Sequence, residues 1–292
     1  MKKLLILILL TLSFISCSSD YDKKLKISAT TWIGYTPLFY AKEKGWLKEL
    51  NIKLLNVSSL SENMYLYKAG NSDAYVGTQY EYGLLSKEDK TLMAIMMLDR
   101  SYGGDMIISN VSIQDLQATS KTIDAYLEID SVNNTMLKDF IKSYKLQDKT
   151  INYINKDQTQ IGLLNAKDMK NPTIIVTYIP YNHTLKKNGF MELTSTKDSL
   201  NLLVLDAMFT TTKVFHEHKK QFVELKKLVD TSVEALQKDP KEFYETIKPY
   251  MLDMSYDEFN DSLSDIIWIN KDMSSELKQR MNNGAFPTRN LI

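Results

Sequence analysis

The sequence is poor in cysteine and histidine. Among its 292 residues there is one cysteine, Cys17, and there are three histidines. Cys17 lies beside an apolar leader, so the remainder of the chain has no thiol for a disulfide bond or for nucleophilic attack. His216 and His218 point to different sides of a predicted helix, which disfavours a shared metal ion. We therefore expect no metal site.

The charge balance and the absence of catalytic motifs exclude further classes of function. Lys+Arg and Asp+Glu are both 36, so the formal net charge is zero and no basic field for nucleic acid is present. The phosphate-binding motif G-x-x-x-x-G-K, the hydrolase motif G-x-S-x-G and the zinc-protease motif H-E-x-x-H do not occur. We expect a protein that is not an enzyme, binds no cofactor and does not contact nucleic acid.

The first residues are typical of a secretory leader. Two lysines precede the apolar run 4–12, which is too short to span a membrane, and Cys17 follows. Cys17 lies where bacterial lipoprotein signals place the residue that is lipidated. We predict a signal peptide at 1–16 and a lipidated tether at 17–24. The lipid would hold the protein on the extracytoplasmic side of a bacterial membrane, and secretion without a lipid is the alternative.

After the leader, the chain alternates between strands and helices. Residues 25–29 alternate as a strand does, and residues 37–44 form a predicted helix that Gly45 ends. Residues 92–98 are apolar throughout, which is typical of a strand buried on both faces. We predict an α/β fold with a parallel sheet covered by helices, a core strand at 200–207 and a helical C-terminal region.

Two loops combine aromatic side chains with a proline at the start of a helix. In the first, Thr36 is the predicted N-cap and Pro37 the first helical residue. Tyr178 to Tyr181 repeats this arrangement around Pro180. Ser61 is the predicted cap of a further helix. Two loops of the same kind predict two walls of one cleft.

Four motifs, taken together, resemble a family of binding proteins. They are WIGYTP at 32–37 with AKEKG at 41–45, AGNSDA at 69–74, DRSYGGD at 99–105, and TSTKD at 194–198. Their order and content resemble substrate-binding proteins of ABC importers, of the nitrate, sulfonate and taurine type that also includes thiamine-precursor binders.

The resemblance implies a two-lobed periplasmic-binding-protein type 2 fold with two crossover strands. Residues 25–105 would form lobe 1, residues 106–205 lobe 2, and residues 206–292 the return to lobe 1 with the C-terminal helices. A small-molecule solute would bind between the lobes, which close on it. The partners implied are an ABC permease and its ATPase, and we expect a monomer.

A pocket for a small polar ligand needs aromatic walls and a few aimed polar groups. The candidate walls are Trp32, Tyr35, Tyr178 and Tyr181. The polar candidates are Thr78, Glu81, Asp99, Ser101, Asp105, Asp130, Ser131 and Asp206. Carboxylates outnumber basic side chains here, since only Arg100 lies in a candidate loop. We therefore predict a cationic or amine-bearing solute.

Structural roles would also explain these residues. Glu81 follows Thr78 by three residues, the spacing of a capping box. Asp130 and Ser131 would cap a helix, and the aspartates at the crossovers would bind backbone N–H groups. The aromatic residues would belong to the core.

Three other functions fit the same fold. One is a ligand-sensing module for a membrane signalling protein, and a second is a binder of anions such as sulfonate or nitrate. A third is an enzyme of pyrimidine synthesis, which would need a histidine-rich loop that the sequence lacks.

The position of Trp32 in the first loop generates a test. We predict that Trp32→Ala abolishes ligand binding and leaves the fold intact, as measured by a binding assay and circular dichroism. Unchanged affinity in this variant would contradict the assignment of the pocket.

Overall fold

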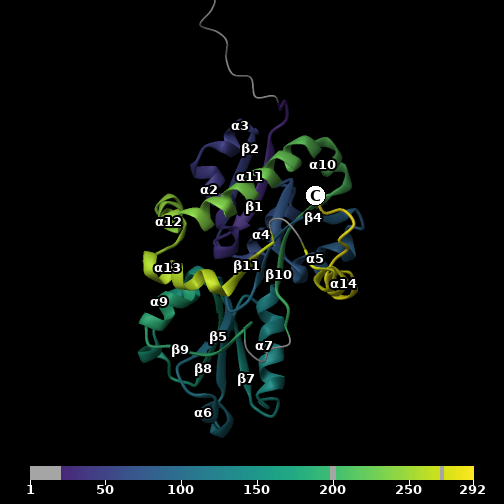
Figure 1. Ribbon diagram of the computed structural model, residues 1–292. Helices are drawn as coiled ribbons and strands as arrows, with labels where there is room; N and C mark the ends of the chain where they lie inside the picture. Colours follow the sequence, from purple (N-terminus) through teal and green to yellow (C-terminus); the bar gives the residue numbers. More distant parts are fainter. Residues whose placement is uncertain (1–20, 198–201, 270–272) are drawn as a thin grey trace, which may run out of the picture.

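The chain forms two lobes, each built on one β-sheet (Figure 1). The computed structural model describes residues 21–197, 202–269 and 273–292. The first lobe holds the sheet β11-β4-β10-β3-β1-β2 and the second the sheet β7-β6-β8-β5-β9. The strands of the first sheet are β1 (Leu25–Thr30), β2 (Ile52–Val57), β3 (Ala74–Thr78), β4 (Leu92–Ser101), β10 (Leu205–Thr211) and β11 (Ile266–Trp268). Those of the second are β5 (Asp105–Ser109), β6 (Ile123–Leu127), β7 (Ile151–Asn155), β8 (Thr173–Tyr178) and β9 (Met191–Ser195).

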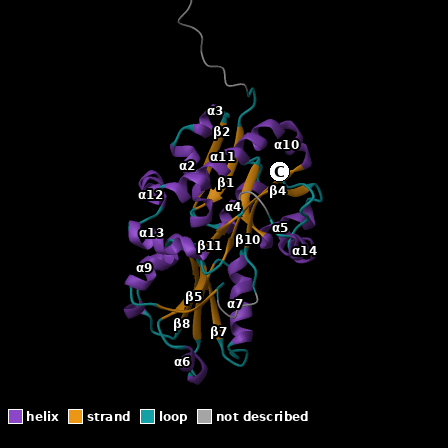
Figure 2. Cartoon of the chain, viewed as in Figure 1, coloured by secondary structure: helices purple, strands orange, loops and turns teal. Residues whose placement is uncertain are grey.

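Helices flank both sheets (Figure 2). In the first lobe they are α2 (Thr36–Glu43), α3 (Trp46–Glu49), α4 (Leu60–Lys68), α5 (Gln79–Glu88), α10 (Thr212–Glu217), α11 (Lys219–Lys238), α12 (Pro240–Ile247), α13 (Tyr256–Ser262) and α14 (Ser275–Gly284). In the second lobe they are α6 (Ile113–Ala118), α7 (Val132–Ser143), α8 (Gln158–Gly162) and α9 (Tyr181–Lys187). Short 3-10 turns are η2 (Ile33–Tyr35), η3 (Ala166–Asp168), η4 (Lys248–Tyr250) and η5 (Leu263–Asp265). The predicted α/β fold with a helical C-terminal region is confirmed.

The sheets are mixed, so the prediction of a parallel sheet was wrong in part. β1 is parallel to β2 and β3, but β10 is antiparallel to both of its neighbours, β3 and β4. In the second sheet, β6 is parallel to β7 and β8, whereas β5 is antiparallel to β8 and β9. The reason is the route of the chain. β5 and β10 each enter their sheet from the junction between the lobes, toward which β8 and β3 run.

Some predicted element boundaries also differ. The N-cap of α2 is Tyr35 rather than Thr36, because the turn η2 precedes the helix and the Thr36 hydroxyl donates to the Ile33 carbonyl. The cap of α4 is Ser59 rather than Ser61, since the Ser59 hydroxyl accepts the Glu62 N–H. The core strand predicted at 200–207 is β10, and residues 200 and 201 lie outside the described residues.

The chain crosses between the lobes after Ser101 and returns before Leu205. Asp105 and Leu205, the last residues of the predicted segments 25–105 and 106–205, are the first residues of β5 and β10. The two connections are bonded to each other at Thr196. Its hydroxyl lies 2.8 Å from the Ser101 hydroxyl and accepts the Gly103 N–H at 2.8 Å. These bonds join the two connections to each other where the chain passes between the lobes.

Residues 21–24 of the predicted tether are described, and the chain before them is not. The predicted signal peptide and Cys17 lie outside the described residues. Within the described ranges, no helix is both long enough and apolar enough to cross a membrane.

We expect substitution of Gly103, in the first connection, to destabilise the fold. Its φ is +130°, and a Cβ there would lie 2.7 Å from Asp265 Oδ1. We expect Gly103→Ala to lower the free energy of unfolding by about 1–3 kcal/mol, measured by urea denaturation. The matched control is Gly83→Ala in α5, where a Cβ would meet no atom within 4 Å. That change should raise stability by about 0.5–1 kcal/mol. Equal effects at the two positions would contradict the prediction.

Candidate binding site

A row of side chains crosses the first sheet at its end nearest the second lobe. The strand register places Thr78 beside Asp206, Asp206 beside Asp99, and Asp99 beside Trp268. Residues directly opposite each other on antiparallel strands share one face of the sheet. The carboxyl groups of Asp99 and Asp206 are therefore neighbours.

Two aromatic side chains hold this carboxyl pair. Trp32 Nε1 donates to Asp99 Oδ1 at 3.1 Å, and the Tyr35 hydroxyl donates to Asp206 Oδ1. Asp99 is 0% exposed and Asp206 is 2% exposed. Burial raises the pKa of both carboxyl groups well above the ordinary aspartate value, and charge repulsion within the pair raises the pKa of Asp206 further. This environment favours a state in which the pair retains a proton.

Two glycines make room for the indole of Trp32. A Cβ on Gly34 would lie 2.2 Å from Asp99 Oδ2 and 2.4 Å from Trp32 Nε1. A Cβ on Gly104 would lie 2.4 Å from Trp32 Cη2. The close approach of the indole to Asp99 therefore requires glycine at both positions.

The second lobe supplies the facing wall. The ring of Tyr178 meets Trp32 edge-on, with centroids 5.7 Å apart, and meets Tyr181 in the same way at 5.5 Å. Asp105 lies at the start of β5, and its N–H donates to the Ser101 hydroxyl at 3.0 Å. Burial raises the pKa of Asp105 to about 7.

A small cavity of about 10 Å³ lies between these walls. It is lined by Thr30, Trp32, Tyr35, Leu60, Thr78, Asp105, Tyr178, Val204 and Asp206. Three buried lining atoms have no hydrogen-bond partner among the described residues: Thr30 Oγ1, Asp105 Oδ2 and Tyr178 Oη. Unpaired buried polar atoms are rare in folded proteins, and all three belong to residues that line a space of about one water molecule. The residues around the cavity thus have hydrogen-bonding capacity that the protein itself does not use.

Two glutamates lie behind the cavity and contact the opposite lobe. Glu81 accepts the Thr78 N–H at 2.8 Å, completing the predicted capping box of α5, and also accepts the Val132 N–H at 3.2 Å. Glu128 follows β6 and accepts the Leu60 N–H at 3.0 Å. Burial raises the pKa of Glu81 and raises that of Glu128 to about 8.

The charge of this region is one-sided. Five acidic residues are buried in the described part of the chain, and no lysine or arginine there is buried. The buried acids are Glu81, Asp99, Asp105, Glu128 and Asp206. None of them takes part in an ion pair within the described ranges. Arg100 follows Asp99 in β4, but its guanidinium lies over the Tyr102 ring. A cationic ligand would supply the missing positive charge.

The structure brings together six of the predicted site residues around the cavity. These are Trp32, Tyr35, Thr78, Asp105, Tyr178 and Asp206. Three further predicted residues contact members of this group without lining the cavity. Asp99 accepts the Trp32 N–H, Glu81 accepts the Thr78 N–H, and the Tyr181 ring packs edge-on against Tyr178. Ser101 bonds the crossover, and Ser131 caps α7 while its hydroxyl donates to the Glu128 carbonyl. Asp130 is exposed and accepts the Tyr65 hydroxyl at 2.8 Å, so it does not reach the cavity.

Sequence reasoning missed four residues. Thr30, Leu60 and Val204 line the cavity, and Glu128 contacts the opposite lobe beside it. Glu128 carried a usable signal, because it directly follows the strand β6, as Asp99 follows the apolar run 92–98. Thr30, Leu60 and Val204 carried none, since their place depends on how the lobes meet.

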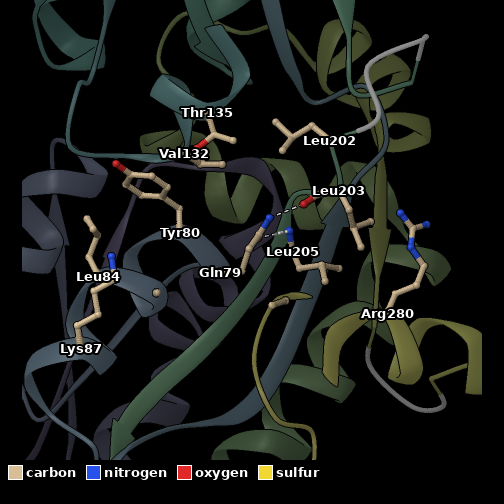
Figure 3. Close-up of a pocket in the computed structure, with 12 residues that line it drawn as sticks. Gln79, Tyr80, Leu84, Lys87, Val132, Thr135, Leu202, Leu203, Leu205 and Arg280 are labelled. Atoms are coloured by element: carbon tan, nitrogen blue, oxygen red, sulfur yellow. Dashed lines mark hydrogen bonds between the residues drawn. The ribbon is translucent and has the colours of Figure 1, made fainter. Parts of the chain in front are cut away.

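A larger hollow of about 540 Å³ lies elsewhere, between α5, α7 and α14 (Figure 3). Its lining is mainly apolar, with Lys87 and Arg280 as its charged groups. Both polar atoms of the Gln79 amide are hydrogen-bonded there, since its nitrogen donates to the Leu203 carbonyl and its oxygen accepts the Leu205 N–H at 2.9 Å. No buried polar atom of this hollow lacks a partner among the described residues. The buried acids and the unpaired polar atoms therefore favour the cavity of about 10 Å³ as the binding site, although the hollow is larger.

Comparison with solved structures identifies the fold. The ligand-binding component of an ABC-type import system from Staphylococcus aureus, with zinc bound, has 12% identity and a TM-score of 0.72, covering 93% of this chain and 96% of that one. The alkanesulfonate-binding protein SsuA from Xanthomonas axonopodis pv. citri, bound to MOPS, has 11% identity and a TM-score of 0.69, covering 90% and 91%. A Candida albicans protein described as having the generic periplasmic binding protein fold has 12% identity and a TM-score of 0.65, covering 85% and 82%.

No protein-family model and no curated protein sequence matches this chain. The structural similarity at such low identity shows the fold alone. The chain thus has the periplasmic-binding-protein fold, which confirms the two-lobed architecture implied by the motifs.

The structure changes what Trp32→Ala would do. The indole is 4% exposed and donates to Asp99, so its removal leaves a cavity and an unpaired carboxyl oxygen. A loss of about 3–5 kcal/mol of stability is typical for such a change. Trp32→Phe keeps one aromatic ring and loses the pyrrole ring with its N–H donor, so it leaves a smaller void than alanine does and is the better variant for a binding test.

The buried acids generate a prediction about stability and pH. Their pKa values are raised in the folded protein, so it retains protons that the unfolded chain releases at lower pH. The free energy of unfolding should therefore decrease as the pH rises from about 4.5 to about 8, by roughly 1.4 kcal/mol per pH unit for each such proton. Urea denaturation at a series of pH values measures this.

Glu128→Gln and Asp105→Asn should each flatten that pH dependence. Asp124→Asn is the matched control, because Asp124 lies at the far end of β6 and its carboxyl group accepts hydrogen bonds from Asn152 and Asn171, both neutral amides. A pH dependence equal in all three variants would contradict the prediction.

Proposed function

We propose that this protein captures a small cationic solute with N–H donors between its lobes and delivers it to an ABC importer. The observation that supports this most is the burial of five acids in and around a small cavity, in a region without a buried lysine or arginine among the described residues. An anionic solute would meet the same carboxyl groups at a cost of like-charge repulsion. We propose binding and delivery, and no catalysis.

The unpaired atoms of the cavity favour a solute that donates hydrogen bonds. Asp105 Oδ2 is a hydrogen-bond acceptor without a donor among the described residues. A primary ammonium, an amidine or a protonated aminopyrimidine carries N–H groups that can reach it, whereas a quaternary ammonium carries none. Trp32 and Tyr178 would add attraction between the cation and their rings.

The similar proteins support solute binding by their fold but differ in the ligands that their names give. One was solved with zinc and another with MOPS, an alkanesulfonate. Function within a shared fold depends on the residues of the site. For this chain, no group of three or more metal-ligating side chains is present in the described ranges, and the cavity is acidic. These observations favour an organic cation.

A solute of several atoms would need more space than the cavity offers. Its volume of about 10 Å³ corresponds to roughly one water molecule. We propose that the lobes separate to admit the solute, turning about the connections after Ser101 and before Leu205, and then close on it.

We also propose that the mature protein is a monomeric lipoprotein. The leader 1–16 would be removed, and a lipid on Cys17 would hold the fold on the extracytoplasmic face of a bacterial membrane. An ABC permease with its ATPase would receive the solute there.

A thermal-shift screen tests the nature of the solute. The probes are primary amines, amidines and aminopyrimidine thiamine precursors, with MOPS, nitrate and zinc chloride as the competing classes. A ligand at a hundred times its dissociation constant stabilises a protein by about 2.7 kcal/mol, which gives a clear shift. Stabilisation by the anions alone would overturn the proposal.

For a cation found in this way, Asp206→Asn should weaken binding about 30-fold or more, because it removes a buried carboxyl group of the cavity. Asp124→Asn should leave the affinity unchanged. The affinity of the parent protein should also rise from about pH 6 to about pH 8, as the raised carboxyl pKa values are passed and charge becomes available. Isothermal titration calorimetry measures both effects, and an affinity that falls with rising pH would indicate an anion.

A further inference from the structure

Two buried glutamates join the lobes in a reciprocal way. Glu128 of the second lobe accepts the N–H of Leu60, the first residue of α4 in the first lobe, at 3.0 Å. Glu81 of the first lobe accepts the N–H of Val132, the first residue of α7 in the second lobe, at 3.2 Å. Each carboxyl group thus lies at the N-terminus of a helix from the opposite lobe, where negative charge is favoured. Both glutamates are only 1% exposed.

Burial of both glutamates depends on contact between the lobes. Leu60 and Val132, whose N–H groups the two carboxyl groups bind, belong to the same apolar cluster as Val204. The contact therefore excludes water from both carboxyl groups at once. When the lobes separate, water can solvate Glu81 and Glu128.

The surroundings of the two carboxyl groups are neutral or negative. Around Glu81 lie the Thr78 hydroxyl, the Val132 N–H and the titratable groups Tyr35, Tyr75, Tyr80, Asp105, Glu128, Tyr178 and Asp206. Around Glu128 lie the Leu60 N–H, the backbone of Gln158 and the titratable groups Glu81, Asp157, Tyr178 and Tyr181. No lysine, arginine or histidine in the described ranges forms an ion pair with either glutamate.

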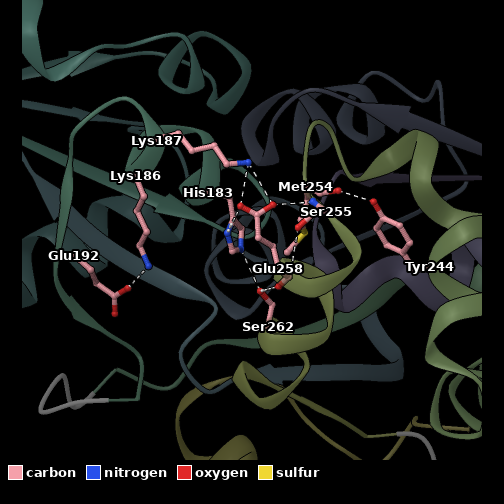
Figure 4. Close-up of polar contacts among 9 residues, drawn as sticks. All are labelled: His183, Lys186, Lys187, Glu192, Tyr244, Met254, Ser255, Glu258 and Ser262. Carbon is pink, nitrogen blue, oxygen red and sulfur yellow. Dashed lines mark hydrogen bonds and ion pairs between the residues drawn. The ribbon is translucent and has the colours of Figure 1, made fainter.

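A second contact between the lobes has the opposite character. At the outer edge, Glu258 of α13 lies 3.0 Å from Lys187 Nζ and 3.7 Å from His183 Nδ1, both on α9 (Figure 4). His183 Nε2 also lies 3.2 Å from the Ser262 hydroxyl. Here closure brings opposite charges together, and the Glu258 side chain stays 26% exposed. The pair of Lys187 and Glu258 needs no added proton to form, whereas His183 pairs with Glu258 as a cation only when it is protonated, and burial lowers its pKa.

We propose that closure of the two lobes takes up protons, because Glu81, Glu128 and the acids beside them can be buried together only when part of their charge is neutralised. Burying unpaired carboxylates is costly, so ionisation favours the separated lobes, in which water solvates them. The raised pKa of Glu128, about 8, agrees with this direction. A cationic solute would replace the protons. The uptake of protons on closure concerns the site of the proposed function, but it does not depend on the binding of any solute.

The test measures the distance between the lobes without added solute. Spin labels are attached at Ala69→Cys at the end of α4 and Lys138→Cys on α7, both exposed, in a Cys17→Ser background that has no other thiol. Pulsed electron paramagnetic resonance is recorded from about pH 5 to about pH 8. We expect a short distance to dominate in acid and a longer distance to become the major population in alkali.

Matched variants identify the groups responsible. Glu128→Gln, and the double variant Glu81→Gln with Glu128→Gln, should reduce the response to pH while circular dichroism shows an intact fold. Glu258→Gln, at the outer edge, should retain the response of the parent. The proposal is overturned if the distances in the parent do not change with pH, or if the double variant responds as the parent does. A failed solute screen combined with pH-dependent closure would reject the proposed function alone.

Discussion

The burial of acidic side chains without a cationic partner is the constraint on which the centre of this molecule depends. Five carboxyl groups lie out of water where the two lobes meet, and backbone N–H groups, hydroxyls and one indole satisfy part of their hydrogen-bonding capacity. The negative charge of the ionised groups is only partly compensated, because hydrogen bonds from neutral groups stabilise a carboxylate less than a salt bridge in good geometry does. Solute binding and lobe closure, as proposed, both follow from the need to neutralise that charge.

The fold positions this cluster by two devices. The first is the register of β3, β10, β4 and β11, which places Asp206 and Asp99 side by side at the junction of the lobes. The second is the pair Gly34 and Gly104, which lets the Trp32 indole lie against Asp99 and Tyr178. A rigid sheet thus carries the carboxyl groups, and the loops that meet it carry the aromatic walls. A site built in this way keeps its geometry within one lobe while the facing lobe can move.

Size and chemistry point to different spaces in this protein. The hollow between α5, α7 and α14 is much larger than the cavity beside the acids, but its buried polar groups are satisfied by the protein itself. In the cavity, Thr30, Asp105 and Tyr178 each have a buried polar atom without a partner in the described ranges. In a protein whose lobes close on a solute, the closed state without solute is expected to leave little free space between the lobes. Polar atoms that would bind the solute are then left unpaired around that space. The cavity has both features.

Local sequence determined much of this protein, and its tertiary structure decided the rest. Strand and helix alternation, the capping box of Thr78 and Glu81, the cap at Ser131 and the aromatic loop around Trp32 were all predictable, because each depends on residues close together in the chain. The direction of β10 was not predictable, nor were Leu60 and Glu128 as contacts across the junction. These depend on a chain that leaves the first lobe, builds the second and returns. Sequence motifs therefore identified most of the acidic residues, but only the packing of the two lobes against each other decided which of them lie around one cavity and are buried from solvent.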